Sequence, residues 1–237
     1  MATDSKVVRT LLNPPQYGSV RLAIGKAIHW HYRLFQMRAH ERTVLEWVCG
    51  MPLLVMPGVL NPKLMRTGKF FASQLTPTLI HRDAEVLDMG TGSGVCAIAA
   101  ARYAKRIVAV DIDQTAVRCA RLNILLNGVD GKIEILMGDL FAPLSGRRFD
   151  VILFNPPFLR GIPRNDADRA WRSVDVAERF AADLRDHLRP RGYALMLLST
   201  YGHAATFIQE FQRNNFKLDV VSERNFVNEK LAIVKFA

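Results

Sequence analysis

The stretch of sequence that decides the fold is EVLDMGTGSG, residues 85–94. Its first half reads as a short apolar strand, and its second half has a glycine at every other position. Such glycines let the backbone turn tightly and let a ligand approach with no Cβ in the way. An alanine-rich helix is predicted to follow over 95–104. This order of strand, turn and helix predicts a ligand site at the carboxyl end of a strand in an open α/β sheet.

The chain after this stretch alternates between strand-like and helix-like segments. Further strands are predicted at 106–110, 133–137, 149–154, 193–198, 217–222 and 230–235, and further helices at 114–127, 168–187 and 204–214. The last two strands follow each other directly, so we expect an antiparallel pair. Repeated strand–helix units predict a parallel sheet with helices on both faces. The predicted fold is therefore a doubly wound α/β domain with a seven-stranded, mostly parallel sheet.

The first 80 residues differ from the rest in being rich in proline, arginine and aromatic residues, with irregular periodicity. We expect a short N-terminal extension over 1–80 that covers a substrate or cofactor site, followed by the main ligand-binding domain over 81–237. Within the extension, 28–34 could be a half-buried strand or a helix. Prolines punctuate an extended passage over 52–62, and a helix is predicted within 64–79.

The charge balance favours an anionic partner. The chain has 237 residues, with 32 basic and 22 acidic side chains and a net charge of +10. Such an excess is typical of proteins that contact RNA, DNA or a ribosomal surface, although a solvated basic surface has the same composition. The longest apolar run, 194–198, is far too short to span a membrane. The N-terminus lacks the apolar core of a secretory signal. We therefore expect a cytoplasmic protein with no membrane partner.

Neither a disulfide framework nor a metal site is predicted. Cys49, Cys96 and Cys119 are widely spaced and form no CxxC pair. His29, His31 and His40 are close in sequence, but no metal-ligand spacing connects them to cysteines or carboxylates. The cysteines are therefore interpreted as small side chains in a reducing compartment.

Three aspartates are predicted at the ends of successive strands. Asp88 stands just before the glycines, Asp111 follows strand 106–110, and Asp139 follows strand 133–137. A carboxylate beside the glycines would repel a pyrophosphate and suits a ligand that carries an ammonium and a sulfonium. An acidic residue at Asp111 can hold ribose hydroxyls, and an adenine amino group needs an acceptor near Asp139. Together the three predict a cofactor site.

Each of these aspartates taken alone could be a helix cap or a turn residue. Asp113 in particular is interpreted as the N-cap of the helix at 114–127.

The loop after the strand at 149–154 has the sequence NPPF, residues 155–158. Two prolines fix the backbone, so Asn155 and Phe158 keep a set relation. The side-chain carbonyl of Asn155 and a proline backbone carbonyl can accept both hydrogens of an –NH₂ group. Phe158 offers a flat face on which a planar amide or base can stack. The chemistry would be an in-line displacement driven by positioning, without a strong general base. The alternative is a proline-stiffened turn capped by asparagine.

Two motifs resemble a known family. VLDMGTGSG at 86–94 resembles motif I of class I S-adenosylmethionine-dependent methyltransferases, and NPPF at 155–158 is similar to the NPP(F/Y) motif of their amino-methylating branch. That branch includes release-factor glutamine methyltransferases, small-domain ribosomal RNA guanine methyltransferases and N6-adenine enzymes. The resemblance implies a Rossmann-like fold with S-adenosyl-L-methionine as the cofactor. Residues 50–62 also resemble the lead-in segment of HemK-like methyltransferases, which curls over the cofactor site. The first 50 residues do not match the release-factor-binding domain of the glutamine enzymes.

The resemblance also implies roles for individual residues. The implied cofactor-binding residues are Asp88, Gly90, Thr91, Gly92 and Gly94 for the methionine part, Asp111 and Ile112 for the ribose, Asp139 and Leu140 for the adenine, and Asn155 beside the methyl group. The implied catalytic residues, which hold the target nitrogen, are Asn155, Pro156 and Phe158.

The predicted function is methyl transfer to a planar amide or exocyclic amino nitrogen, in a protein glutamine or a nucleic-acid base. The acceptor could belong to a nucleic acid, a ribosomal or translation-factor partner, or a small molecule. A basic N-terminal arm over 21–42, with Trp30 and Tyr32, could guide an anionic substrate or be a structural cover. One alternative is an enzyme that uses the same cofactor to tailor a small metabolite, for example by cyclisation. Another is a nucleic-acid-binding module that has lost its chemistry.

Overall fold

The computed structural model describes residues 6–14, 42–164, 168, 170–226 and 229–237. Residues 15–41 lie outside the described residues, and they include the segment 28–34 and all of the basic arm over 21–42 except Arg42. The described part of the first 80 residues contains helix α1 (Lys6–Leu12), strands β1 (Val44–Val48) and β2 (Met51–Val55), and helix α3 (Thr67–Gln74).

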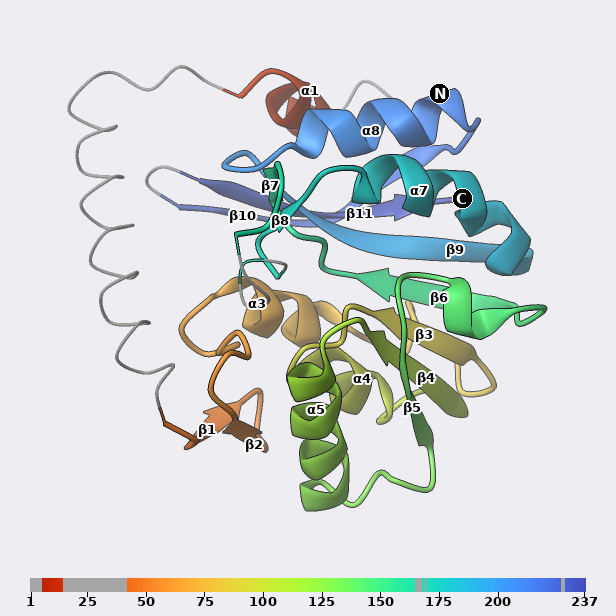
Figure 1. Cartoon of the computed structure of the whole chain (residues 1–237). Coiled ribbons are helices and arrows are strands. Elements are labelled where there is room, and N and C mark those ends of the chain that lie inside the picture. Colours follow the sequence, from red (N-terminus) through yellow and green to blue (C-terminus); the bar gives the residue numbers. More distant parts are fainter. Residues whose placement is uncertain (1–5, 15–41, 165–167, 169, 227–228) are drawn as a thin grey trace.

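The centre of the molecule is one seven-stranded sheet (Figure 1). Its strands are β3 (Glu85–Met89), β4 (Arg106–Asp111), β5 (Ile133–Met137), β6 (Phe149–Phe154), β9 (Leu188–Ser199), β10 (Leu218–Asn225) and β11 (Lys230–Phe236). They lie in the order β10-β11-β9-β6-β3-β4-β5. The strands from β5 to β9 run parallel, whereas β11 is antiparallel to β9 and β10 to β11. The predicted fold class and the closing antiparallel pair are confirmed.

The strand order brings the two predicted motifs together. The chain leaves β3 toward β4 on one side, and β6 later pairs with β3 on the other side, with Met89 opposite Phe154. Ligands of open α/β sheets bind where the strand order reverses in this way. The glycine turn after Met89 and the loop after Phe154 therefore start from adjacent positions at the carboxyl edge of the sheet.

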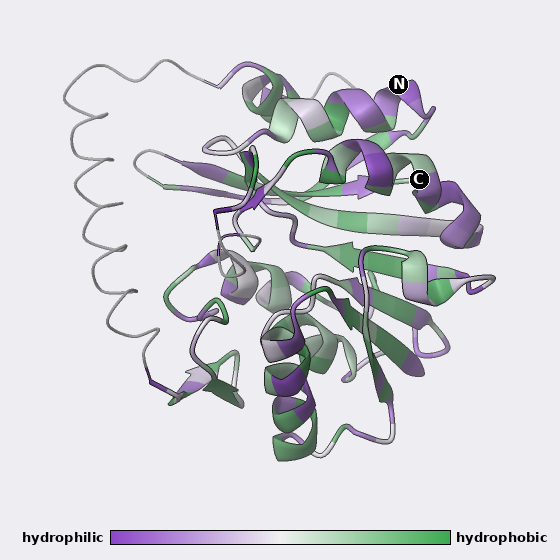
Figure 2. Cartoon of the chain, viewed as in Figure 1, coloured by the Kyte–Doolittle hydropathy of each residue, from purple (hydrophilic) through white to green (hydrophobic). Residues whose placement is uncertain are grey.

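Helices cover both faces of the sheet (Figure 1). One face carries α3, α4 (Val95–Ala100) and α5 (Gln114–Leu126), and the other carries α1, α7 (Val176–Asp183) and α8 (Ala204–Arg213). Alternate residues of β3 contribute to the two core clusters, Leu87 to one and Val86 to the other. A strand buried on both faces has to be apolar throughout, as Figure 2 shows for the centre of the sheet. Within the described residues, none of the helices is both long and apolar enough to cross a membrane.

The segments before residue 80 pack against this core. Val8 and Leu11 of α1 are buried in the cluster that contains α7 and α8. The hairpin of β1 and β2 lies against α5, where the Asn123 side chain accepts a hydrogen bond from Leu54 N (2.6 Å) and donates one to Leu54 O (2.7 Å). The same amide nitrogen donates to Ser93 O (2.9 Å), so it also holds the glycine turn. The division into an extension and a main domain stays a prediction.

The helix predicted at 168–187 is interrupted: Asp168 is helical, residues 170–175 are not, and α7 begins at Val176. Arg172 and Ser173 form a short strand, β8, that pairs in parallel with β7 (Leu159–Arg160). The Asp168 carboxylate accepts hydrogen bonds from Arg164 N (3.0 Å) and Arg172 Nε (3.2 Å). These bonds join Asp168, which is helical, to the bend at Arg164 and to β8.

Other predicted boundaries also need correction. The helix expected over 95–104 ends at Ala100. The helix predicted within 64–79 is confirmed as Thr67–Gln74. The helix before β9 closes with the 3₁₀ turn η2 (Leu184–His187). β9 starts at Leu188, five residues before the predicted position, because Pro190 and Gly192 form an irregularity inside the strand instead of a break before it.

Candidate cofactor and acceptor site

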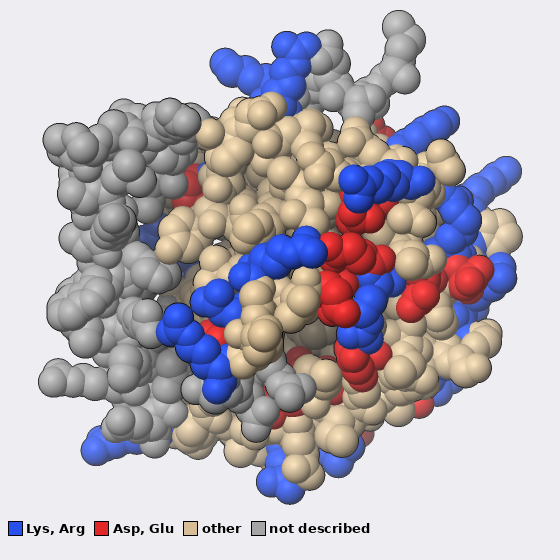
Figure 3. Space-filling view, turned by 45° about the horizontal axis from the view of Figure 1, so that its top comes forward, with Lys and Arg blue, Asp and Glu red and all other residues tan. Residues whose placement is uncertain are grey.

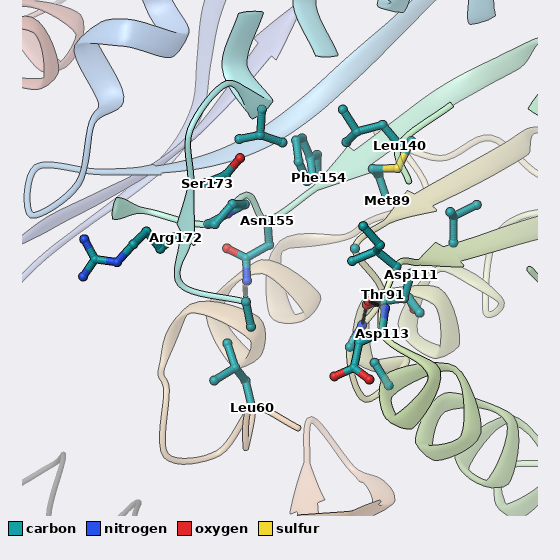
Figure 4. Close-up of a pocket in the computed structure, with 18 of the residues that line it drawn as sticks. Leu60, Met89, Thr91, Asp111, Asp113, Leu140, Phe154, Asn155, Arg172 and Ser173 are labelled. Carbon is teal, nitrogen blue, oxygen red and sulfur yellow. Dashed lines mark hydrogen bonds between the residues drawn. The ribbon is translucent and has the colours of Figure 1, made fainter. Parts of the chain in front are cut away.

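A cavity of about 750 Å³ opens at the carboxyl edge of the sheet (Figure 4). Four parts of the chain line it: the segment 58–68, the glycine turn after β3, the ends of β4 and β5, and the residues that follow β6 as far as α7. The first of these parts includes Gly58, Val59, Leu60 and Pro62, from the segment that was expected to curl over the cofactor site.

The glycine turn is held in a backbone shape that needs glycine. Gly90, Gly92 and Gly94 have φ angles of 64°, 56° and 82°, in the left-handed region. A Cβ on Gly94 would lie 3.3 Å from Ala120 Cβ. Thr91 N donates to Val110 O at 3.0 Å, which fixes the turn to the neighbouring strand β4. The turn is therefore formed before any ligand arrives.

Asp88 lies behind this turn. Its Oδ2 atom accepts hydrogen bonds from Thr91 Oγ1 (2.7 Å) and from Ala97 N (3.0 Å), in the first turn of α4. The Asp88 side chain is buried, and Asp88 is not among the described residues that line the cavity. Burial raises the pKa of Asp88 from 3.8 to about 7, although the two hydrogen bonds oppose the rise. Direct contact between Asp88 and the cofactor stays a prediction. The hydrogen bonds that Asp88 accepts in this structure stabilise the glycine turn.

Asp111 links the turn to the end of β4. Its two carboxylate oxygens accept hydrogen bonds from Gly92 N (2.8 Å) and Asp113 N (3.0 Å). Burial raises the pKa of Asp111 above its usual value of 3.8. Each oxygen keeps a further lone pair, so the carboxylate can also accept from ligand hydroxyls. Asp111 and Ile112 both line the cavity.

Asp113 is the N-cap of α5, as predicted. Its Oδ1 atom accepts a hydrogen bond from Thr115 N at 2.7 Å. Asp113 also lines the cavity, as Asp111 does, although the sequence analysis assigned it no part in ligand binding.

Asp139 and Leu140 line the cavity at the end of β5. Asp139 Oδ2 accepts a hydrogen bond from Arg179 Nη2 at 2.6 Å, in an ion pair that connects β5 to α7. This bond raises the pKa of Arg179, so the guanidinium stays charged. Nothing in the sequence pattern predicted the pair, because its partners are 40 residues apart.

The loop after β6 places one unpaired acceptor at the cavity wall. Asn155 Oδ1 is buried, and no atom of the described residues forms a hydrogen bond with it. Asn155 lines the cavity together with Phe154 and Pro157, and Figure 4 shows it across the cavity from Asp111. Buried polar atoms are nearly always paired, and leaving one unpaired costs about 1–3 kcal/mol. An incoming donor would remove that cost.

Phe158 is held away from the cavity. It packs on the core cluster beneath the sheet, and its carbonyl oxygen accepts a hydrogen bond from His203 N at 3.0 Å. A Cβ on Gly202 would lie 2.7 Å from this oxygen, so the approach requires glycine there. The stacking role predicted for Phe158 stays a prediction.

Most of the predicted site residues share one cavity, and four do not line it. Those that line it are Gly90, Thr91, Gly92, Asp111, Ile112, Asp139, Leu140 and Asn155. Those that the structure places outside the described lining are Asp88, Gly94, Pro156 and Phe158. The sequence analysis missed Arg164, and it also missed four lining residues on the segment it assigned to a helix, namely Arg172, Ser173, Val174 and Arg179.

The cavity fits S-adenosyl-L-methionine. Its wall at the β4 and β5 ends carries the carboxylates of Asp111, Asp113 and Asp139, which suits a ligand with a sulfonium and an ammonium. A Cβ on Gly92 would meet no atom within 4 Å, so the turn leaves space for a ligand. Among the described residues, no three histidine, cysteine, aspartate or glutamate side chains are grouped so that they could hold a metal ion.

Comparison with known proteins identifies the family. The model of the methyltransferase small domain family matches residues 50–222. The chain is 32% identical over 151 residues to a ribosomal RNA small subunit methyltransferase C of Alcanivorax borkumensis, a match that covers 63% of this chain and 43% of that protein. It is 31% identical over 162 residues to a putative protein N5-glutamine methyltransferase of Methanocaldococcus jannaschii, covering 65% of this chain and 81% of that one. The chain thus spans less than half of the first relative and most of the second.

Solved structures agree on the fold. The chain resembles the T. thermophilus 16S rRNA N2 G1207 methyltransferase, solved in complex with AdoMet and guanosine, with a TM-score of 0.56 and 21% identity over 82% of this chain and 50% of that one. The family model and the fold lead to one conclusion: the chain belongs to the methyltransferase small domain family, a branch of the class I S-adenosyl-L-methionine-dependent N-methyltransferases.

Proposed function

We propose that this protein transfers a methyl group from S-adenosyl-L-methionine to an exocyclic amino or side-chain amide nitrogen, and that Asn155 receives the target –NH₂ group. The observation that carries the proposal is the buried Asn155 Oδ1, which lacks a partner among the described residues and lies at the cavity wall. An unpaired buried carbonyl is costly, so a donor that arrives with the substrate explains why the asparagine is there.

The chain would act by positioning the nitrogen. When bound, S-adenosyl-L-methionine supplies an electrophilic methyl group on a sulfonium. Asn155 Oδ1 and the Pro156 carbonyl oxygen are acceptors, and two N–H bonds to them direct the nitrogen lone pair away from the loop. Pro156 and Pro157 fix the backbone between them, so little freedom is lost when the substrate binds. Correct orientation alone can supply a large part of a rate enhancement, and no strong general base is needed.

The opposite wall would hold the cofactor. The Asp111 carboxylate is fixed by two backbone donors and has capacity for ribose hydroxyls. Gly90 and Gly92 would allow close approach to the methionine part, and Asp139 with Leu140, which line the same cavity, would face the adenine. Asp88 supports this wall from behind through Thr91 and Ala97.

The names of the relatives are compatible with this chemistry. One is a ribosomal RNA methyltransferase, one is a putative glutamine methyltransferase, and the neighbour by fold modifies the N2 atom of a guanine. Guanine at N2 and the glutamine side chain at its amide each carry an –NH₂ group attached to a planar system. Either would satisfy the two acceptors of the loop after β6.

The test uses Asn155→Ala and two readouts. Calorimetry measures binding of S-adenosylhomocysteine, and incubation with radiolabelled S-adenosyl-L-methionine measures label transfer to total RNA and to total protein. We expect the variant to bind S-adenosylhomocysteine within about threefold of the wild type and to lose about 100- to 1,000-fold in transfer rate, since preorganised groups of this kind contribute that much. Full transfer by the variant, or a cofactor product other than S-adenosylhomocysteine, would refute the proposal.

A further inference from the structure

The cavity has opposite charges on its two sides. The ends of β4 and β5 contribute Asp111, Asp113 and Asp139, whereas the segment after β6 contributes three arginines, Arg164, Arg172 and Arg179, and one carboxylate, Asp175. Figure 4 shows Asn155 between these sides, with Asp111 and Asp113 on one side of it and Arg172 on the other. Figure 3 shows basic side chains beside the hollow in this face and acidic ones, mixed with basic ones, on its opposite flank. The acidic side suits the cationic cofactor, so the basic side is left to the acceptor.

The basic side is a built element. Leu159 N donates to Trp171 O (2.8 Å) and Gly161 N donates to Ser173 O (3.0 Å), which closes the two-stranded sheet of β7 and β8. Arg160 of β7 forms an ion pair with Glu178 of α7 at 2.8 Å, so the element is joined to the main domain.

Positive charge exceeds negative charge within this element. The Asp168 carboxylate accepts from Arg172 Nε and from Arg164 N, and the backbone bond is the main reason that the pKa of Asp168 is lowered. That bond involves the backbone N–H of Arg164, so it does not engage the Arg164 side chain. Within the described residues the Arg164 guanidinium forms no ion pair within 4 Å, although its charge helps to lower the pKa of Asp168, and it lies exposed at the cavity. Such a guanidinium is ready to bind an oxyanion.

The position of the charge selects among acceptors. An acceptor that places an –NH₂ at Asn155 and an anion at Arg164 would use both of these lining residues. A nucleotide does so, because its exocyclic amine is on the base and its phosphate is on the backbone. A glutamine side chain in a peptide carries no anion in a fixed relation to its amide. Ile162, with 81% of its surface exposed, lies two residues before Arg164 and offers an apolar contact for a flanking base.

We propose that Arg164, supported by Arg172, forms a phosphate-binding subsite for a single-stranded nucleic-acid acceptor whose target base is held by Asn155. This inference rests on the proposed function and gives its acceptor class.

The test compares Arg164→Ala with Arg148→Ala. Arg148 is also exposed, has no ion-pair partner among the described residues, and lies just before β6 at the opposite edge of the sheet. Both variants lose one positive charge. The probes are fluorescein-labelled, mixed-sequence 12-nucleotide RNA and DNA of the same sequence, measured by anisotropy with saturating S-adenosylhomocysteine at several salt concentrations.

We expect Arg164→Ala to weaken binding of the better probe about tenfold and to reduce the slope of log K against log salt by about one phosphate contact. Arg148→Ala should change both by much less, and Arg164→Lys should recover part of the affinity. Calorimetric binding of S-adenosylhomocysteine should stay unchanged in all three variants. The tighter of the two probes identifies the polymer.

Two results would overturn the subsite while leaving the proposed function intact. One is equal loss of affinity in Arg164→Ala and Arg148→Ala. The other is wild-type protein that binds S-adenosylhomocysteine but neither oligonucleotide, with methyl transfer only into protein. Absence of S-adenosylhomocysteine binding by the wild type would instead refute the proposed function itself.

Discussion

The glycine turn after β3 and the loop after β6 lie side by side at the carboxyl edge of the sheet, but their polar groups are satisfied to different degrees. In the turn, Asp88 and Asp111 each accept two hydrogen bonds from nearby donors. In the loop and the element that follows it, Asn155 Oδ1 accepts no hydrogen bond and the Arg164 guanidinium forms no ion pair within 4 Å among the described residues.

This difference suggests two kinds of binding surface. A turn whose own bonds hold it in shape can receive the same cofactor in every cycle without reorganising. Under our proposal, the open acceptor and the open cation of the loop find their partners when the substrate binds. Preorganisation of both kinds lowers the entropy that must be lost at the reacting centre.

The largest effect outside the acceptor loop is expected at Asp111. Asp111→Ala removes the acceptor that we propose for the ribose hydroxyls and frees Gly92 N and Asp113 N, and hydrogen bonds to a charged group contribute about 1.5–3 kcal/mol each. We expect calorimetry to show S-adenosylhomocysteine binding weakened about 100-fold.

The matched control is Asp113→Ser, which keeps a side chain able to cap α5. It should weaken binding only severalfold. Equal effects of the two substitutions would show that any carboxylate at the end of β4 serves, and the distinction between Asp111 and its neighbour would be lost.

A smaller effect is expected at Asp88, and it depends on pH. The folded protein raises the pKa of Asp88 from 3.8 to about 7, so it binds the proton more tightly than the unfolded chain does. The stability from this group is therefore full below the unfolded pKa, falls as pH rises between the two values, and is lowest above the folded pKa. Each pH unit inside this window changes the free energy of unfolding by at most about 1.4 kcal/mol.

Asp88→Asn stays neutral and should lose this dependence. Urea unfolding at pH 5.5 and pH 8 should show the variant gaining about 1–2 kcal/mol relative to the wild type between the two conditions. If the difference in free energy of unfolding between variant and wild type is the same at both pH values, the folded protein does not raise the pKa of the Asp88 carboxyl.

The smallest effect is expected at the ion pair between Arg179 and Asp139. Their side chains are 44% and 43% exposed, and exposed pairs of this kind contribute less than about 1 kcal/mol. Arg179→Ala should lower the free energy of unfolding by a few tenths of a kcal/mol at low salt and by less at high salt. A loss of several kcal/mol would show that α7 depends on this ion pair. The segment proposed to bind the acceptor and the strand ends proposed to bind the cofactor would then depend on each other for stability, contrary to our account.

Much of the fold could be predicted because strands buried on both faces leave short, continuous apolar runs. The bounds of β3, β5 and β6 agree with the predicted ranges for this reason. The convergence of Asp111, Asp139 and Asn155 could also be predicted, because parallel strands end at one edge of the sheet.

The remainder depended on packing that sequence spacing does not contain. Residues 168–175 were assigned to a helix, yet after Asp168 the chain turns and forms the short strand β8 before α7 begins. The Asp168 carboxylate holds Arg164 N and Arg172 Nε across this interruption. The direction of a side chain was equally beyond reach. Asp88 points toward α4, and Phe158 packs on the core, although each directly adjoins a residue that lines the cavity.

The measurement that tests the central claim most directly is the pair of readouts on Asn155→Ala. If the loop after β6 serves the acceptor and the turn after β3 serves the cofactor, affinity for S-adenosylhomocysteine will stay within about threefold of the wild type while methyl transfer falls by two to three orders of magnitude. If transfer persists at the wild-type rate, or if cofactor affinity collapses together with transfer, the assignment of these two regions to separate tasks is wrong.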